Sequence, residues 1–221
     1  MRYLSIIILI GLLSSCSHTQ TSSKFDMRQA VGDMMQLEQT YEENKDSNVA
    51  NELIRLYEAI SEHSHDTNDY YTLAHCRMLA EVHRYDEAIA LSDSLYDKDK
   101  PLFKERLYLM KACYSNDTAA FNLHLSNILN YLENITSNHD GLWDSLMRIP
   151  LHDGYVDGAL DPMYWSQMFE LKYVYLSVAN GLEVTCRQLT DRAQSQEWDA
   201  DQYNLLLKRI REFDYMSLTW W

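Results

Sequence analysis

The chain has 221 residues and a mass of 26.0 kDa, and 46% of its residues are hydrophobic, which is too many for a disordered chain. Its six Gly and three Pro are too few for the frequent turns of a β-sandwich or a β-barrel. The formal net charge of −14 repels nucleic-acid phosphates and anionic lipid head groups, so we expect neither as a partner. The composition predicts an acidic, all-α protein.

Residues 1–15 have the features of an export signal. Arg2 supplies a positive charge, and the apolar run that follows it, of about ten residues, is far shorter than the roughly 20 that a membrane-spanning helix needs. The order Leu13-Ser14-Ser15-Cys16 resembles the lipobox of bacterial lipoproteins. In that family the cysteine is acylated and the signal is removed in front of it. The resemblance implies Cys16 as the site of lipid attachment and a lipid anchor in the membrane.

The residue after the cysteine bears on the membrane in which the anchor is placed. Many lipoproteins that stay in the inner membrane have an Asp there, whereas this chain has Ser17. The resemblance therefore implies the periplasmic face of the bacterial outer membrane, with residues 16–26 as a lipidated, flexible tether. The alternative is an ordinary secretory signal in which Cys16 is incidental.

Apolar residues recur at intervals of three and four along most of the remaining chain, as on one face of a helix. The clearest stripe is Phe121, Leu125, Ile128, Leu132 and Ile135. Similar stripes begin at Ala30, Val49, Leu73, Ala88, Phe103, Tyr164 and Tyr203. No segment alternates apolar and polar residues over a sustained length, so we expect almost no sheet.

Helix starts are also marked in the sequence. Pro101 and Pro162 suit the first turn of a helix, and Asp199 and Gln202 are spaced like a capping box. Short polar breaks such as Asn116-Asp117 force consecutive helices to run antiparallel. The sequence thus predicts stacked helical hairpins.

These hairpins would occupy residues 27–140. A segment rich in Gly and Pro, residues 141–162, is predicted to be an irregular loop. Residues 163–221 would form a C-terminal helical cap.

The segment from His83 to Leu91, which reads HRYDEAIAL, resembles the start of the second helix of a tetratricopeptide repeat. A weaker copy follows, in which Ala120 corresponds to Ala88 at a shift of 32, near the family period of 34. The resemblance covers roughly residues 70–135 and implies a TPR-like α-solenoid. It carries no catalytic residue, because the repeat family has none.

Cys76, Cys113 and Cys186 match no metal-binding spacing, and we expect them to be small buried side chains. A Cys76–Cys113 disulfide is an alternative in an oxidising compartment.

Two groups of possible metal ligands are explained without a metal. Asp153, Asp157 and Asp161 are four residues apart, unlike a calcium loop, and they form turns with the neighbouring glycines. His63 and His65 lie at the end of a predicted helix, where histidine meets the negative end of the helix dipole. We expect no metal and no cofactor, and no catalytic motif is present.

The sixteen Tyr and five Trp are more than helix packing normally requires. Aromatic rings provide contact area at protein interfaces and stacking faces for sugars. The candidate ligand-contact residues are Tyr70, Tyr71, Tyr155, Tyr164 and Trp165. We predict a scaffold that binds a protein or peptide. The alternatives are a glycan-binding lipoprotein and an all-α hydrolase, and the oligomeric state stays open. The rings can also serve packing alone.

Overall fold

The computed structural model describes residues 25–64, 69–96, 98–149 and 162–216. These residues form ten α-helices and contain no strand, which confirms the all-α prediction for this part of the chain. Among the described helices, none combines the length and apolar character that crossing a bilayer requires.

The first six helices in chain order are α2 (Met27–Asn44), α3 (Ser47–His63), α4 (Tyr70–Glu81), α5 (Tyr85–Ser92), α6 (Lys100–Tyr114) and α7 (Thr118–Thr136). They are followed by α8 (Asp140–Leu146), α9 (Pro162–Asn180), α10 (Leu182–Gln196) and α11 (Ala200–Glu212). From α2 to α7, each helix packs on the one before it.

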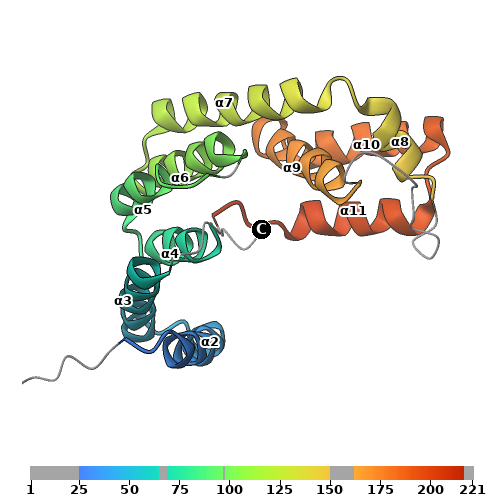
Figure 1. Ribbon diagram of the computed structural model, residues 1–221. Helices are drawn as coiled ribbons and strands as arrows, with labels where there is room; N and C mark the ends of the chain where they lie inside the picture. The colour runs from blue at the N-terminus through green and yellow to red at the C-terminus, as the bar shows by residue number, and fades with distance from the viewer. Residues whose placement is uncertain (1–24, 65–68, 97, 150–161, 217–221) are drawn as a thin grey trace, which may run out of the picture.

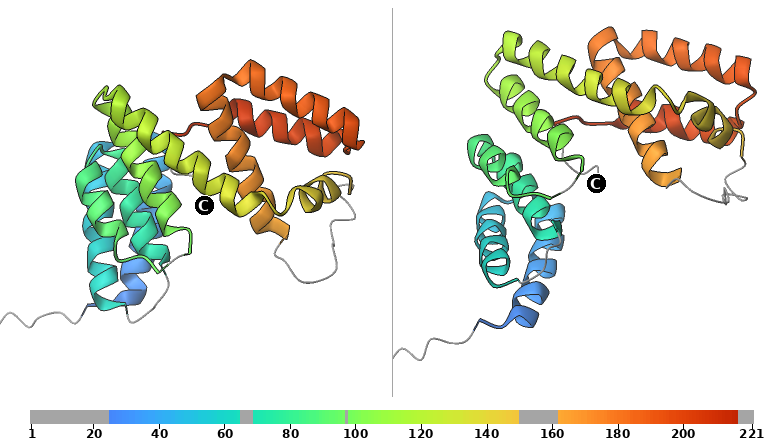
Figure 2. Two further views of the ribbon diagram at one scale, coloured as in Figure 1. Left: turned by 90° about the horizontal axis from the view of Figure 1, so that it is seen from above. Right: turned by 45° about the horizontal axis from the view of Figure 1, so that its top comes forward.

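The long helix α7 then contacts α9, which in turn contacts α8, α10 and α11. Figure 1 shows the resulting bend: α2 to α5 form one arm, α8 to α11 the other, and α7 runs along the top. Seen from above, α7 crosses from the first group of helices to the second (Figure 2). We call the side enclosed by the two arms the inner side of the bend.

Four helical hairpins turn at a residue with a left-handed backbone that is not glycine. The residues are Lys45, His83, Asn116 and Glu197, with φ between 50° and 63°. An aspartate follows three of these turns and caps the next helix, accepting backbone N–H groups with its side chain: Asp46, Asp117 and Asp199. The short connections and their caps explain why consecutive helices run antiparallel.

The core has three apolar clusters that share helices. One lies among α2 to α6, one among α6, α7 and α9, and one among α8 to α11. Helix α9 is buried on nearly all sides in its middle, where Met168, Phe169 and Leu171 are inaccessible to solvent. A helix that is apolar all round belongs inside a protein, and α9 links the two arms in this way.

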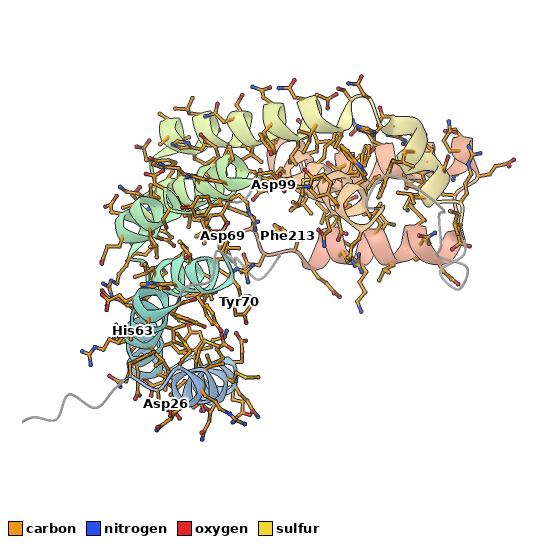
Figure 3. All side chains as sticks on the ribbon, viewed as in Figure 1. Asp26, His63, Asp69, Tyr70, Asp99 and Phe213 are labelled. Atoms are coloured by element: carbon orange, nitrogen blue, oxygen red, sulfur yellow. The ribbon has the colours of Figure 1, made fainter. Side chains whose placement is uncertain are left out.

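Both ends of the described chain are fixed by contacts. The Phe25 ring stacks on His63 at 4.2 Å between centroids. Asp26, which is labelled in Figure 3, caps α2. At the other end, the segment after α11 extends back toward the N-terminal arm (Figure 1), where Met216 packs against the apolar cluster of α2 to α6. We call residues 213–216 the return segment.

The structure differs from the expectations in three places. The first part of the predicted loop 141–162 is helical, because α8 extends to Leu146. Helix α10 lies within the predicted C-terminal cap, but no apolar stripe predicted it, because only Thr185 and Leu189 of that helix are buried. The capping box at α11 is half formed. Asp199 caps the helix, but the Gln202 amide donates to the carbonyl oxygens of Leu146 and Ile149, at the end of α8.

Candidate functional site

The most distinctive hollow in the described residues lies among α2, α3 and α4, and we call it the α2–α4 pocket. Its volume is about 280 Å³. It is lined by Glu38, Tyr41, Glu42, Tyr57, Tyr70, Ala74, Arg77, Met78 and Glu81. A second hollow of about 460 Å³, between α2 and α3, is lined mostly by exposed side chains and has no aromatic wall.

One end of the α2–α4 pocket is built around Tyr57 and Glu38. The Tyr57 hydroxyl donates to Glu38 Oε1 at 2.5 Å. Burial, and then this bond, raises the pKa of Tyr57 far above that of a free phenol. Burial and the neighbouring Arg106 lower the pKa of Arg77, whose positive charge acts on Tyr57 and Tyr70. This end therefore combines a carboxylate, a guanidinium and neutral phenols.

The other end is built around Tyr41. Its hydroxyl donates to Glu81 Oε2 at 3.5 Å, and burial followed by the Glu81 charge raises the pKa of Tyr41. Lys45 lies beside it, with Nζ 4.7 Å from the centroid of the Tyr41 ring and 3.0 Å from Glu42 Oε2. Burial lowers the pKa of Lys45, but the bond to Glu42 and the negative charges of Glu42 and Glu81 together outweigh burial, so the pKa of Lys45 is raised. An ammonium group is thus already held by an aromatic face and a carboxylate.

The pocket walls carry more negative than positive charge. Three carboxylates (Glu38, Glu42 and Glu81) face one guanidinium (Arg77), which leaves a formal charge of −2, or −1 with the adjacent Lys45. The tyrosines are neutral at physiological pH and present hydroxyl donors and ring faces. The pocket is therefore suited to a ligand with a positive charge and an apolar stem.

Tyr70 forms the rim of the pocket on the inner side of the bend (Figure 3). It is 51% exposed, and its ring meets that of Tyr71 edge-on, at 5.3 Å and 80°. Next to it, Asp69 Oδ2 accepts the backbone N–H of Tyr96, whose side chain is 85% exposed. The start of α4 thus gathers three tyrosines, two of which are open to solvent.

Tyr164 and Trp165 lie elsewhere, at the start of α9. The Tyr164 hydroxyl donates to Asp99 Oδ1 at 3.1 Å, and Tyr131 donates to the same oxygen at 2.8 Å. The Trp165 ring lies 3.8 Å from that of His139. These contacts join α9 to α6, α7 and the start of α8. The structure therefore brings Tyr70 and Tyr71 together but not Tyr164 and Trp165 with them.

The remaining predicted residues are outside the description or carry no site. Cys16 and Tyr155 lie outside the described residues, as do the aspartates of 150–161. His63 Nδ1 lies 2.8 Å from the Ala59 carbonyl oxygen, in the last turn of α3. No group of three or more His, Cys, Asp or Glu side chains is placed to hold a metal ion in the part of the chain that the structure describes.

The three cysteines of the described helices are free thiols. Cys76 is fully buried, and burial raises the pKa of its thiol to about 12. Cys113 and Cys186 are half-buried.

Sequence reasoning missed Glu38, Tyr41, Tyr57 and Arg77 as pocket residues. A signal was present: Glu38 and Tyr41 are three residues apart, so they share one helix face. Arg77 interrupts an apolar run between Cys76 and Met78, which is an unusual position for a guanidinium unless the group is paired. No local pattern, however, indicates that three helices bring these residues together.

Searches found no significant match to this chain among models of protein families, curated proteins or solved structures. We therefore infer the function from the pocket and its surroundings.

Proposed function

We propose that this chain is a lipid-anchored scaffold that binds a protein or peptide on the inner side of its bend. The observation that carries the proposal is the α2–α4 pocket, which three successive helices line with tyrosines and carboxylates, with Tyr70 exposed at its rim. Aromatic side chains that keep a polar tip in water are typical of protein interfaces.

The proposed scaffold is a degenerate TPR-like solenoid. His83 and Asn116, 33 positions apart, end α4 and α6 in the same way. In both turns the N–H of this residue bonds the carbonyl three residues earlier, and the next N–H bonds the carbonyl five residues earlier. Ala88 is fully buried, and Cys76 Sγ donates to its carbonyl oxygen at 3.5 Å, so α4 and α5 approach closely. These features favour a repeat with a period near 34 residues.

The proposed anchor is an acyl group on Cys16, in the periplasmic face of the outer membrane. Its support is the lipobox-like order of Leu13-Ser14-Ser15-Cys16. Phe25 lies nine positions after Cys16, and this length of chain can span at most about 32 Å. In this proposal α2 and α3 are the helices nearest the membrane, and the pocket faces partners at its surface.

A peptide explains the pocket better than a glycan does. Sugars bind on flat aromatic platforms, whereas the Tyr70 and Tyr71 rings are nearly perpendicular. The volume of about 280 Å³ is also at the lower limit of small-molecule sites, which suits one side chain rather than several sugar rings.

Site-specific photo-crosslinking in living cells tests this function. A photoreactive phenylalanine derivative at position 70 should capture a discrete polypeptide. The same group at position 114 is the matched control, because Tyr114 is 57% exposed but lies outside the pocket. Equal capture at both positions, or capture of no polypeptide together with specific binding on a glycan array, would exclude the proposal.

A further inference from the structure

The α2–α4 pocket has a composition that selects the charge of its ligand. Glu42 and Glu81 flank the ring of Tyr41 at one end, and Glu38 accepts a hydrogen bond from Tyr57 at the other. An anionic side chain would meet three carboxylates there. A neutral polar side chain would leave the carboxylates without a cation. A cation with an apolar stem satisfies both the charges and the ring faces.

Lys45 already makes contacts of this kind, with an aromatic ring and a carboxylate, at the edge of the pocket. Its ammonium lies over the Tyr41 ring and pairs with Glu42, although half of the Lys45 side chain is exposed. Lys45 is not among the residues that line the cavity. It therefore contacts two lining residues, Tyr41 and Glu42, from outside the cavity and does not fill the cavity.

Arg77 does not convert the pocket into an anion site. Its single positive charge is outnumbered by three carboxylates on the same walls. Burial and the nearby Arg106 already disfavour the positive charge of Arg77, so a second cation next to Arg77 would be unfavourable. The favourable region for a ligand cation is therefore near Tyr41 and Glu81.

We propose that the α2–α4 pocket receives one lysine or arginine side chain of a partner polypeptide, with the ring of Tyr41 and the carboxylates of Glu42 and Glu81 holding its charge. The exposed Tyr70 at the rim then contacts the residues beside it. The overall charge of −14 attracts such a cationic segment from a distance. This inference rests on the proposed function and narrows its ligand.

Binding of capped tripeptides to the full-length protein in detergent micelles tests the inference. The probes are Ala-Lys-Ala and Ala-Arg-Ala, with Ala-Gln-Ala and Ala-Glu-Ala as controls, followed by ligand-observed NMR. The lysine and arginine peptides should bind, more weakly as salt is raised, and the two controls should not. Equal binding of Ala-Gln-Ala, preferred binding of Ala-Glu-Ala, or no binding of any probe would overturn the inference.

Substitutions on α2 and α4 sharpen this test. The double variant Glu42→Gln and Glu81→Gln should lose about tenfold in affinity for Ala-Lys-Ala, since a partly exposed ion pair is removed at each position. Glu43→Gln is the matched control, because Glu43 is exposed on α2 but does not line the pocket. Unchanged affinity in the double variant, with its fold verified by circular dichroism, would contradict the assignment.

A substitution of Lys45 is expected to raise the affinity for the ligand, and a misfolded protein would not show such a rise. Lys45→Asn removes the resident ammonium and keeps a residue type that tolerates φ of 50°. Its affinity for Ala-Lys-Ala should rise several-fold, and no rise would count against the site. Crosslinking at position 70 without any binding of the cationic tripeptides would leave the proposed function intact and refute only this inference.

Discussion

The hydroxyl of Tyr215 lies 3.7 Å from the sulfur of Cys113, although 102 positions separate them in the sequence. The Tyr215 ring also meets Phe121 edge-on, at 6.4 Å. The return segment thereby attaches the end of the C-terminal arm to α6 and α7. Burial, and then the Cys113 interaction, raises the pKa of Tyr215 to about 12, so its hydroxyl stays neutral.

Removing the Tyr215 ring should loosen this attachment. We expect Tyr215→Ala to lower the free energy of unfolding by about 1–2 kcal/mol, because a half-buried aromatic side chain is lost. Urea denaturation measures this loss. Tyr96→Ala, at a largely exposed tyrosine, should change stability by less than about 0.5 kcal/mol. Alkylation of Cys113, followed by peptide mapping, should also be faster in Tyr215→Ala; an unchanged rate would show that Tyr215 does not cover the thiol.

The close approach of α4 and α5 should not tolerate a larger side chain at Ala88. Ala88→Leu places three further carbon atoms in a fully buried position and should cost about 1–3 kcal/mol of stability. Ala90→Leu adds the same atoms to the exposed face of the same helix. Thermal denaturation of both variants makes the comparison, and similar melting temperatures for the two would argue against close packing at Ala88.

Glu170 predicts a dependence of stability on pH. It is 2% exposed and pairs with Arg209 Nη1 at 3.1 Å, while its Oε1 has no hydrogen-bond partner among the described atoms. Burial raises the pKa of Glu170, and Arg209 only partly offsets this. The folded state thus holds the proton more tightly than the unfolded chain does. Its stabilising contribution is complete below the unfolded pKa of about 4.5 and is lost as the pH rises through the folded value.

Glu170→Gln should therefore be more stable than the parent protein at pH 7, on the order of 1 kcal/mol, and similar to it at pH 4. Arg209 is half exposed, so water solvates its charge when the carboxylate is removed. Denaturation curves between pH 4 and 7 measure the difference. Glu183→Gln, at an exposed position of α10, is the control and should show no such divergence. A variant that is destabilised at pH 7 would show that the Arg209 pair outweighs burial.

The proposed membrane anchoring depends on acylation of Cys16. Cys16→Ser should abolish labelling by radioactive fatty acid and move the protein from the detergent phase to the aqueous phase in Triton X-114 partition. Each acyl methylene contributes about 0.8 kcal/mol to membrane binding, so losing the chains removes most of the affinity. Cys186→Ser should retain both properties. Labelling that persists in Cys16→Ser would exclude this cysteine as the attachment site.

The helices could be predicted wherever one face alone is buried. The stripe from Phe121 to Ile135 coincides with the inward face of α7, where Leu125, Ile128 and Leu132 are buried. Helix α10 was not predicted, because its buried face is narrow and consists of Leu189 and Thr185, and threonine is not part of a hydrophobic pattern. The Gln202 amide binds the end of α8 instead of its own helix, a choice that depends on tertiary packing.

The pocket could not be predicted to the same degree. Tyr70 and Tyr164 were both predicted as ligand contacts because aromatic rings suit binding surfaces. Only the structure separates them, since the Tyr164 hydroxyl bonds Asp99 while Tyr70 remains at a rim. The partners of each ring come from other helices, and one sequence does not reveal which helices adjoin.

The order of contacts along the chain has a consequence for how the protein folds. From α2 to α7 each helix packs on its predecessor, so native structure can grow stepwise from a local nucleus as the chain emerges during synthesis or translocation. The return segment is the last part of the described chain to join, because its residues meet α6 and α7 only after every intervening helix has been made. The N-terminal arm can thus fold before the return segment docks. Until it docks, Phe213–Met216 stays accessible to a protease that cleaves incompletely folded chains.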